Sequence, residues 1–186
     1  MMRIITGKAR GTRLFTLPGD ATRPTSEKVK EAVFSVIQFD IEGRRILDLF
    51  SGSGQLALEA LSRGALNAVA VDSSRDAVSV IKKNAEKTHL SDDLKIITAD
   101  YKTAVKQLSG KNKFDIVFID PPYAAKLAGD AVRRVCEAGL LSESAVIIAE
   151  SDEDKNYENE TVSLYRSYRY GKTFISVYKK ISEPGI

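Results

Sequence analysis

The residues with the clearest chemical potential form a short segment in which an apolar run ends in an acid, two prolines and an aromatic ring: Asp120, Pro121, Pro122 and Tyr123. Proline fixes φ and lacks an amide hydrogen, so these prolines end the strand predicted over 114–119. The carbonyls beside them lose intrachain partners and can accept hydrogen bonds. A carboxylate and fixed carbonyls beside an aromatic ring suit a flat base with an exocyclic amino group. The alternative interpretation is a Pro-Pro turn with a capping acid.

A second segment, from Asp48 to Gly54, has the composition of a ligand-binding loop between a strand and a helix. Gly52 and Gly54 let the backbone approach a ligand closely, and the amides that open the following helix point at it. Asp72 follows about twenty residues later, where dinucleotide-binding folds place the acid that binds a ribose diol. Asp100 ends the next predicted strand and could accept a hydrogen bond from an adenine amino group.

These acids also bear on which nucleotide would bind. Asp48 lies within the loop segment, where it would repel a pyrophosphate but suit the cationic amino group of a methionine moiety. The set therefore favours S-adenosylmethionine over NAD. Each acid alone is equally consistent with a cap or a solvated loop. Three acids at the carboxyl ends of consecutive strands instead line the crevice where such sheets bind ligands.

Strands and helices alternate along most of the chain. Predicted strands cover 45–50, 67–72, 94–99, 114–119 and 145–150, and predicted helices cover 25–39, 55–63, 75–87, 101–108 and 126–137. Apolar strands joined by helices predict a parallel sheet covered on both faces. The runs 161–169 and 172–179 have no helix between them and predict an antiparallel hairpin. The predicted fold class is therefore α/β, with a doubly wound, mostly parallel seven-stranded sheet, Rossmann-like, and a C-terminal antiparallel hairpin.

The first 24 residues read as a basic arm attached to a single domain over 25–186. The net charge is only +3, but seven lysines and arginines lie within residues 1–30 against two acids, whereas residues 150–160 are acidic. Such an arm suits a phosphate backbone. The residues expected to bind RNA phosphates are Arg10, Arg13, Arg23, Lys28 and Lys30. The alternative is a solvated terminus. The tyrosines and arginines of the hairpin could extend this surface, or alternate members could face the core.

Composition excludes several other classes of protein. At 186 residues the chain fits one domain, and its single cysteine, Cys136, rules out an internal disulfide framework and a cysteine-based zinc site. No apolar run approaches membrane-spanning length, and the N-terminus lacks a signal-like apolar region. We therefore expect a cytoplasmic protein without membrane contact, and nothing in the sequence requires a partner subunit, so we expect a monomer.

Together these motifs resemble the class I methyltransferases, and among them the RsmD-type enzymes, which methylate the N2 amino group of a guanine in 16S ribosomal RNA. The resemblance covers essentially the whole chain. It rests on Arg3-Ile4-Ile5-Thr6-Gly7 with Arg10-Gly11, on Thr22-Arg23-Pro24-Thr25 running into residues 29–34, on residues 47–54, on residues 58–65, and on Asp120-Pro121-Pro122-Tyr123. Ala57 departs from the glycine usual in the family. The resemblance implies that S-adenosylmethionine is held by Asp48, Phe50, Gly52, Ser53, Gly54, Asp72 and Asp100.

The resemblance also implies a mechanism and a substrate. The methyl group would move in line from the sulfonium to guanine N2, with Asp120 and the Pro121 carbonyl accepting N2–H hydrogen bonds and Tyr123 stacking on the base. No metal is needed. The partner would be ribosomal RNA, within the small subunit or its assembly intermediate. The alternatives are an adenine-N6 methyltransferase acting on DNA or RNA, a methyltransferase of protein side-chain amides, and a non-catalytic RNA-binding module that retains the fold.

Overall fold

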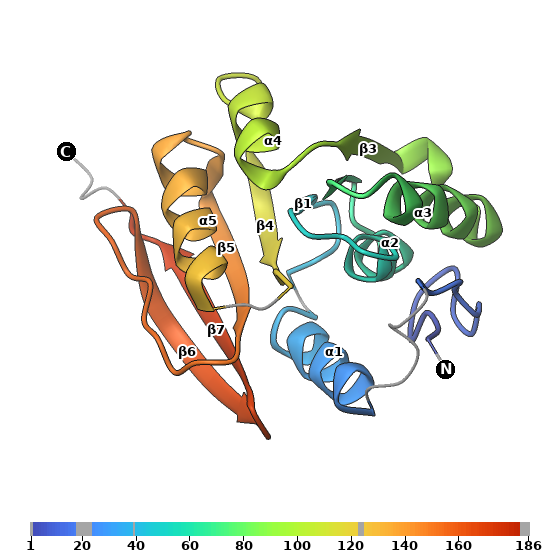
Figure 1. The fold of residues 1–186 in the computed structure, drawn as a ribbon, viewed down its shortest axis with the longest axis horizontal. Coiled ribbons are helices and arrows are strands. Elements are labelled where there is room, and N and C mark those ends of the chain that lie inside the picture. Colours follow the sequence, from blue (N-terminus) through green and yellow to red (C-terminus); the bar gives the residue numbers. More distant parts are fainter. Residues whose placement is uncertain (1, 18–23, 39, 123–124, 183–186) are drawn as a thin grey trace.

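The computed structural model describes residues 2–17, 24–38, 40–122 and 125–182, without the side chains of 24–28 and 125–126 (Figure 1). Its strands form one seven-stranded sheet in the order β3-β2-β1-β4-β5-β7-β6. Their bounds are β1 Arg45–Asp48, β2 Asn67–Asp72, β3 Leu94–Thr98, β4 Phe114–Ile119, β5 Leu141–Ser151, β6 Val162–Tyr170 and β7 Thr173–Lys180. Strands β1 to β5 pair in parallel, and β7 pairs antiparallel with both β5 and β6. The predicted fold class is confirmed.

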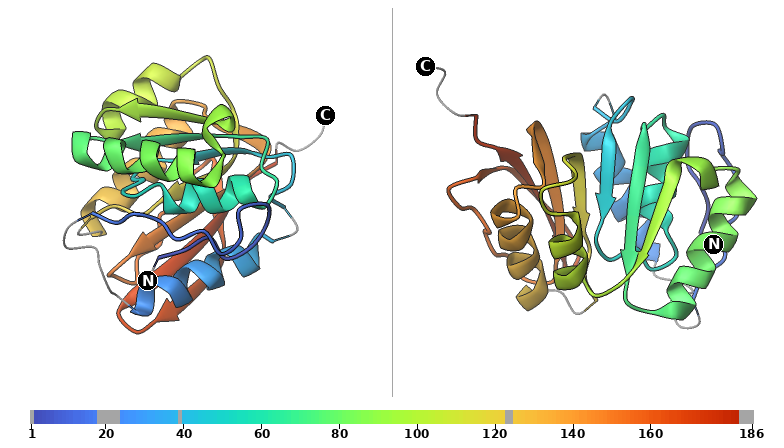
Figure 2. Two further views of the ribbon diagram at one scale, coloured as in Figure 1. Left: turned by 90° about the vertical axis from the view of Figure 1, so that its right-hand side faces the viewer. Right: turned by 90° about the horizontal axis from the view of Figure 1, so that it is seen from above.

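The helices lie in two layers, one on each face of the sheet (Figure 2). They are α1 Pro24–Val36, α2 Gln55–Ser62, α3 Arg75–Thr88, the short 3-10 helix η1 Ser91–Asp93, α4 Tyr101–Leu108 and α5 Ala125–Glu137. Helices α1, α2 and α3 share one apolar core with one face of the sheet, and α4 and α5 share a second core with the other face. No helix in the described part of the chain is long and apolar enough to cross a membrane.

Most element boundaries agree with the prediction, and the exceptions have local causes. Strand β5 begins at Leu141 instead of residue 145. A register shift between Phe114 and Ile116 of β4 lets Leu141 pair with Phe114. The added segment contains the exposed residues 143–144, so it carries no apolar signal. Helix α1 ends at Val36, before Phe39, which lies outside the described residues.

The first 17 residues, as far as they are described, are packed against α2 and α3. Ile4, Ala9 and Leu14 are buried in the first core. The backbone crosses α2 so closely at Gly7, where φ is +85°, that an added Cβ would lie 1.7 Å from the carbonyl oxygen of Ser62. Only glycine therefore fits this crossing. The described part of the basic arm, residues 2–17, is an ordered surface, and its inward-facing side chains are part of the core.

A bulge at Tyr165 divides the hairpin. The register of β6 shifts between Leu164 and Arg166, so the alternation of side chains reverses there. Leu164 packs against the second core, whereas Tyr168 and Tyr170 pack against the first. These two tyrosines thus face the core, as one of the two alternatives for the hairpin expected.

Candidate active site

Four of the predicted site acids meet at the carboxyl ends of neighbouring strands. Asp48 ends β1, and Asp72 and Asp120 each lie two residues beyond its register partners on the flanking strands β2 and β4. Asp100 lies two residues beyond the partner of Asp72 on β3. Side chains two residues apart along a strand share a face of the sheet. The register therefore places this row of acids at one edge of the sheet, with Asp48 and Asp72 on the same face.

Asp48 is the central member of this row, and it is fully buried. Neither of its carboxylate oxygens has a hydrogen-bond partner of acceptable geometry among the described residues. The Ser51 hydroxyl donates instead to the Asp48 carbonyl oxygen at 3.1 Å. Burial, chiefly, and the negative charge of Asp120 raise the pKa of Asp48 to about 7, although the nearby Ser51 hydroxyl opposes this shift. The site therefore contains a buried acid that has no counter-ion among the described residues.

Asp72 holds the glycine loop in place. Its Oδ2 accepts a hydrogen bond from the Gly52 amide at 2.9 Å, and its Oδ1 accepts one from the Ser74 amide at 2.8 Å. Gly52 and Gly54 both have left-handed backbone, with φ of +53° and +79°. An ionised carboxylate offers about four acceptor positions, so two remain for a ligand such as a ribose diol.

Asp100 caps a helix at the same edge. Its Oδ1 accepts from the amides of Lys102 and Thr103, at 3.0 and 3.1 Å, and its Oδ2 accepts from the Thr103 hydroxyl at 2.6 Å. These bonds, the hydroxyl first, lower the pKa of Asp100. The capping role that the sequence allowed is therefore present, and contact with an adenine amino group stays a prediction.

Phe50 and Tyr101 connect the glycine loop to α4 and α5, the helices that cover the second core. Their ring centroids lie 5.2 Å apart, and the Tyr101 hydroxyl donates to Asp130 Oδ2 on α5 at 2.7 Å. Burial, and then this hydrogen bond, raise the pKa of Tyr101 to about 12. Burial also raises the pKa of Asp130, but hydrogen bonds from Tyr101 and two arginines outweigh it and hold that pKa well below its usual range. Sequence reasoning placed Phe50 at the cofactor but missed this support.

The arm supports the glycine loop from its other side through Asn84, a fully buried residue of α3. The Asn84 side chain exchanges hydrogen bonds of 2.7 and 3.0 Å with the backbone of Phe15 and donates to the Ser53 carbonyl at 2.9 Å. The Ser53 hydroxyl in turn contacts the sulfur of Met2 at 3.1 Å. Sequence reasoning missed Asn84, although a polar residue at an apolar-phase position of an amphipathic helix was a signal for it.

Glu59 of α2 makes a second connection to the arm and corrects one prediction. Its fully buried carboxylate accepts from the amides of Ile5 and Thr6, at 2.7 and 3.1 Å, and from Arg63 Nε at 2.7 Å. Lys30 Nζ lies 4.0 Å from this carboxylate and donates to the Arg3 carbonyl at 2.8 Å. Lys30 is only 3% exposed, so the expectation that it binds RNA phosphates is wrong. Its helical position faces the core instead.

Of the other residues expected to bind RNA, the structure describes the side chains of two and not those of the other two. Arg10 and Arg13 are exposed on the arm, as such a role requires. Arg23 lies outside the described residues, and so does the Lys28 side chain. Their contact with RNA stays a prediction.

The proposed catalytic segment follows β4 directly. Asp120 is exposed, Pro121 is buried and Pro122 is exposed, while Tyr123 lies outside the described residues. Asp120 lies two residues beyond Phe118, the register partner of Asp48, and its negative charge contributes to the raised pKa of Asp48. A hydrogen-bond acceptor for an amino group thus lies beside the glycine loop, at the edge where the acids meet.

These features fit S-adenosylmethionine. The Asp48 carboxylate has no counter-ion among the described residues, and a methionine ammonium would bring that positive charge. The space over the α-carbon of Gly52 is open, with no heavy atom of a described residue within 4 Å of an added Cβ. Asp48 is enclosed beneath the loop, so direct contact with the ammonium stays a prediction. Asp72 keeps acceptor capacity for a ribose. The fold and the site together define a class I methyltransferase.

Comparison with known proteins is consistent with this class. Residues 2–179 match the family described as conserved hypothetical protein 95. The chain is 35% identical to "Putative rRNA methyltransferase YlbH" of Bacillus subtilis, covering 96% of this chain and 99% of that protein. It is 35% identical to "Ribosomal RNA small subunit methyltransferase D" of Haemophilus influenzae, covering 83% and 80%. The structure titled "Putative methyltransferase yhhF from Escherichia coli" superposes with a TM-score of 0.86 at 28% identity, covering 98% and 99%. The chain belongs to this family of RsmD-type methyltransferases.

Proposed function

We propose that this protein methylates the exocyclic N2 amino group of a guanine in the RNA of the small ribosomal subunit. Family membership makes S-adenosylmethionine-dependent methylation of ribosomal RNA the expected activity. The observation that supports an amino-group target is Asp120, an exposed acid followed by two prolines, beside the glycine loop. The choice of guanine N2 is the finer part of the proposal. The protein would act as a cytoplasmic monomer on the subunit or its assembly intermediate.

The residues of the site have distinct tasks in this proposal. S-adenosylmethionine supplies an activated methyl group when bound, with Asp48, Phe50, Gly52, Ser53, Gly54, Asp72 and Asp100 around it. Asp120 accepts a hydrogen bond from N2–H, with the Pro121 carbonyl as second acceptor, and so orients the amino lone pair. Its negative charge then stabilises the positive charge that develops on nitrogen, and the nitrogen loses one proton to solvent at this exposed position to give neutral N2-methylguanosine. Tyr123 stacks on the base and limits its motion, which contributes through orientation.

RNA binding relies on exposed cations of the arm. Arg10 and Arg13 contact phosphates, which supplies affinity and salt dependence more than sequence choice. The target base must leave its stack or come from a loop where unstacking costs less. An isolated antiparallel bridge joins Arg3 and Arg13, so the arm presents Arg13 from a fixed backbone.

The test is transfer of labelled methyl into four acceptors: naked 16S RNA, small subunits, genomic DNA and bulk protein. RNA and subunits should come from a strain lacking the enzyme, and mass spectrometry should identify the labelled nucleoside. We expect N2-methylguanosine. Label in N6-methyladenine or in protein would overturn the substrate, and no label in any acceptor would favour the binding module.

Asp120→Asn is the variant that tests the catalytic role. It keeps the shape of the side chain but removes the charge, so kcat should fall about 10²- to 10³-fold, as when one preorganised electrostatic contact is lost. Calorimetric affinity for S-adenosylmethionine should stay near that of the wild type. Asp92→Asn, which alters an exposed acid of η1, is the matched control and should leave kcat unchanged. Loss of cofactor binding in Asp120→Asn would contradict the assigned role.

A further inference from the structure

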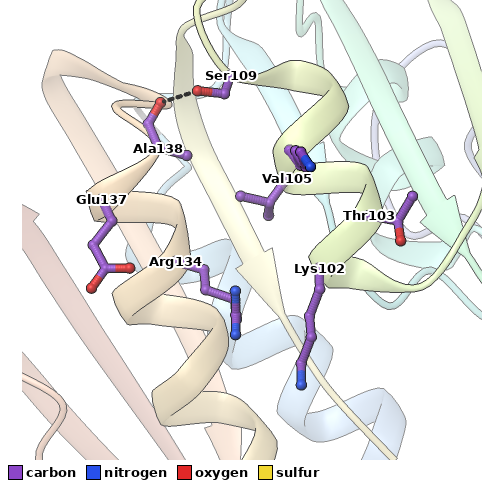
Figure 3. A pocket seen from close by; sticks show the side chains of 8 residues that line it. Lys102, Thr103, Val105, Ser109, Arg134, Glu137 and Ala138 are labelled. Carbon is purple, nitrogen blue, oxygen red and sulfur yellow. Dashed lines mark hydrogen bonds between the residues drawn. The ribbon is translucent and has the colours of Figure 1, made fainter.

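A groove of about 440 Å³ runs between α4 and α5, on the helical layer opposite the arm (Figure 3). Its lining includes Lys102 and Lys106 from α4 and Arg134 from α5. At one end, the Ser109 hydroxyl donates to the Ala138 carbonyl at 3.1 Å and joins the two helices. The proposed methyl transfer leaves this groove without a task.

The groove carries positive charge that its own walls do not neutralise. Lys102 and Lys106 are four residues apart, so their like charges share one side of α4 and weaken the helix. Neither forms an ion pair with another described residue. Glu137, the acid in the lining, is already held by Arg133 through two hydrogen bonds of 2.8 Å. An anionic partner would offset the repulsion between the two lysines.

Arg134 is held in position for such a partner. Its Nε donates to Asp130 Oδ2 at 2.6 Å, and the same oxygen accepts from the Tyr101 hydroxyl at 2.7 Å. Guanidinium has five N–H donors, so an arginine anchored through Nε still has four on its terminal nitrogens. Figure 3 shows the Arg134 side chain directed from α5 across the groove toward α4. A phosphate entering the groove would meet a cation whose orientation is already fixed.

The groove also opens toward the edge of the sheet where the acids meet. Lys102 lies at the opposite end of the groove from Ser109 (Figure 3). It is two residues beyond Asp100, and the intervening Tyr101 packs on Phe50 of the glycine loop. A chain bound along the groove would therefore reach the proposed active site at the Lys102 end.

We infer that the α4/α5 groove binds the phosphate backbone of the RNA substrate. The inference rests on the proposed function and extends it to a second contact surface. The arm with Arg10 and Arg13 lies on one helical layer, and the groove lies on the other. RNA held on both layers would bracket the edge of the sheet, with the target base between the two contacts. Charge complementarity and continuity with this edge identify RNA as the partner.

The test measures RNA affinity as a function of salt for Lys102→Ala/Lys106→Ala in the full-length protein. The probe is the naked 16S RNA of the methylation assay. Each lost phosphate contact on a single strand reduces the slope of log K against log salt by about 0.7, so two contacts reduce it by about 1.4. If the variant and the wild type bind equally at 1 M salt, the variant should bind about 25-fold more weakly than the wild type at 0.1 M. Alanine removes the like-charge pair and favours helix, so thermal stability should not fall.

Two controls separate charge from folding. Lys102→Arg/Lys106→Arg keeps both cations and should retain the wild-type slope. Lys155→Ala removes an exposed lysine from the acidic 150–160 segment and should also leave the slope unchanged. Calorimetric affinity for S-adenosylmethionine should stay constant in all three variants.

The outcomes distinguish this inference from the proposed function. A wild-type slope in the alanine variant, with N2-methylguanosine still formed, would overturn the groove and leave the function intact. Weaker binding to intact subunits but not to naked RNA would identify a ribosomal protein as the partner and would also overturn it. If the wild-type protein methylates no RNA, the function fails first. A reduced slope in the alanine variant alone supports the groove.

Discussion

Replacing Asp48 with asparagine should stabilise the cofactor-free protein at neutral pH and weaken cofactor binding. Asp48 is fully buried, and its pKa of about 7 compares with an ordinary value of 3.8. The folded state therefore holds this proton more tightly than the unfolded state. The stability linked to the neutral carboxyl is fully present below pH 3.8 and is lost as pH rises through 7. Asparagine has no proton to lose, so the variant escapes this loss.

The size of the effect follows from the shift in pKa. Each pKa unit corresponds to 1.36 kcal/mol, so the full shift amounts to about 4 kcal/mol. More than a third of it has been lost by pH 5 and nearly all by pH 8. Between pH 5 and pH 8, the difference in the free energy of unfolding between Asp48→Asn and the wild type should therefore grow by about 3 kcal/mol in favour of the variant. For a chain of this size, that corresponds to a difference in Tm of about 6–12 °C.

Urea unfolding at pH 5, 6, 7 and 8 without cofactor measures the effect, and calorimetry measures cofactor affinity. Asp92→Asn, at an exposed position, should show little change with pH. A constant difference between Asp48→Asn and the wild type across this range would refute the raised pKa. Unchanged affinity for S-adenosylmethionine in Asp48→Asn would refute the role of Asp48 as counter-ion to the ammonium.

Two further predictions concern the contacts that support the site. Glu59→Gln replaces the buried carboxylate that pairs with Lys30 and Arg63 by a neutral amide, so the free energy of unfolding should fall by about 3–5 kcal/mol. Urea denaturation measures this loss, and an unchanged midpoint would refute it. Tyr101→Phe removes the hydrogen bond to Asp130, and a double-mutant cycle with Asp130→Asn should give a coupling of about 1–2 kcal/mol. The KM for S-adenosylmethionine should rise with kcat little changed, and no coupling in the cycle would show that the hydroxyl is dispensable.

The elements that position the site were predictable because their signals are local. Strand and helix periods, and the glycines that follow three helices at Gly64, Gly110 and Gly139, depend on near neighbours in the chain. All three glycines have left-handed backbone, as such caps require. The order of acids along the chain then placed Asp48, Asp72 and Asp100 at one edge, because parallel strands end on the same side.

What the sequence did not predict depends on contacts between distant residues. Lys30 and Glu59 are both charged, and only the packing of α1 against α2 shows that they are buried near one another. The burial of Asp48 also depends on distant contacts. The local sequence of an acid at the end of a strand is the same whether solvent or a folded loop covers the side chain. The bulge at Tyr165 arises from pairing with β7, which the composition of β6 alone does not reveal.

The arm and the cofactor loop share a set of buried polar atoms, and this determines how RNA binding can be tested. Glu59 and Asn84 each satisfy backbone groups of the arm, and Asn84 also holds the loop at Ser53. Deleting the arm would remove two hydrogen bonds from each of these side chains, at a cost of about 1–3 kcal/mol for each group left unsatisfied. Lost activity in a truncated protein would therefore report a disturbed cofactor loop as readily as lost RNA contact. Substituting the exposed Arg10 or Arg13 alone keeps the buried atoms paired, so the resulting change in the salt dependence of RNA binding can be assigned to the phosphate contact.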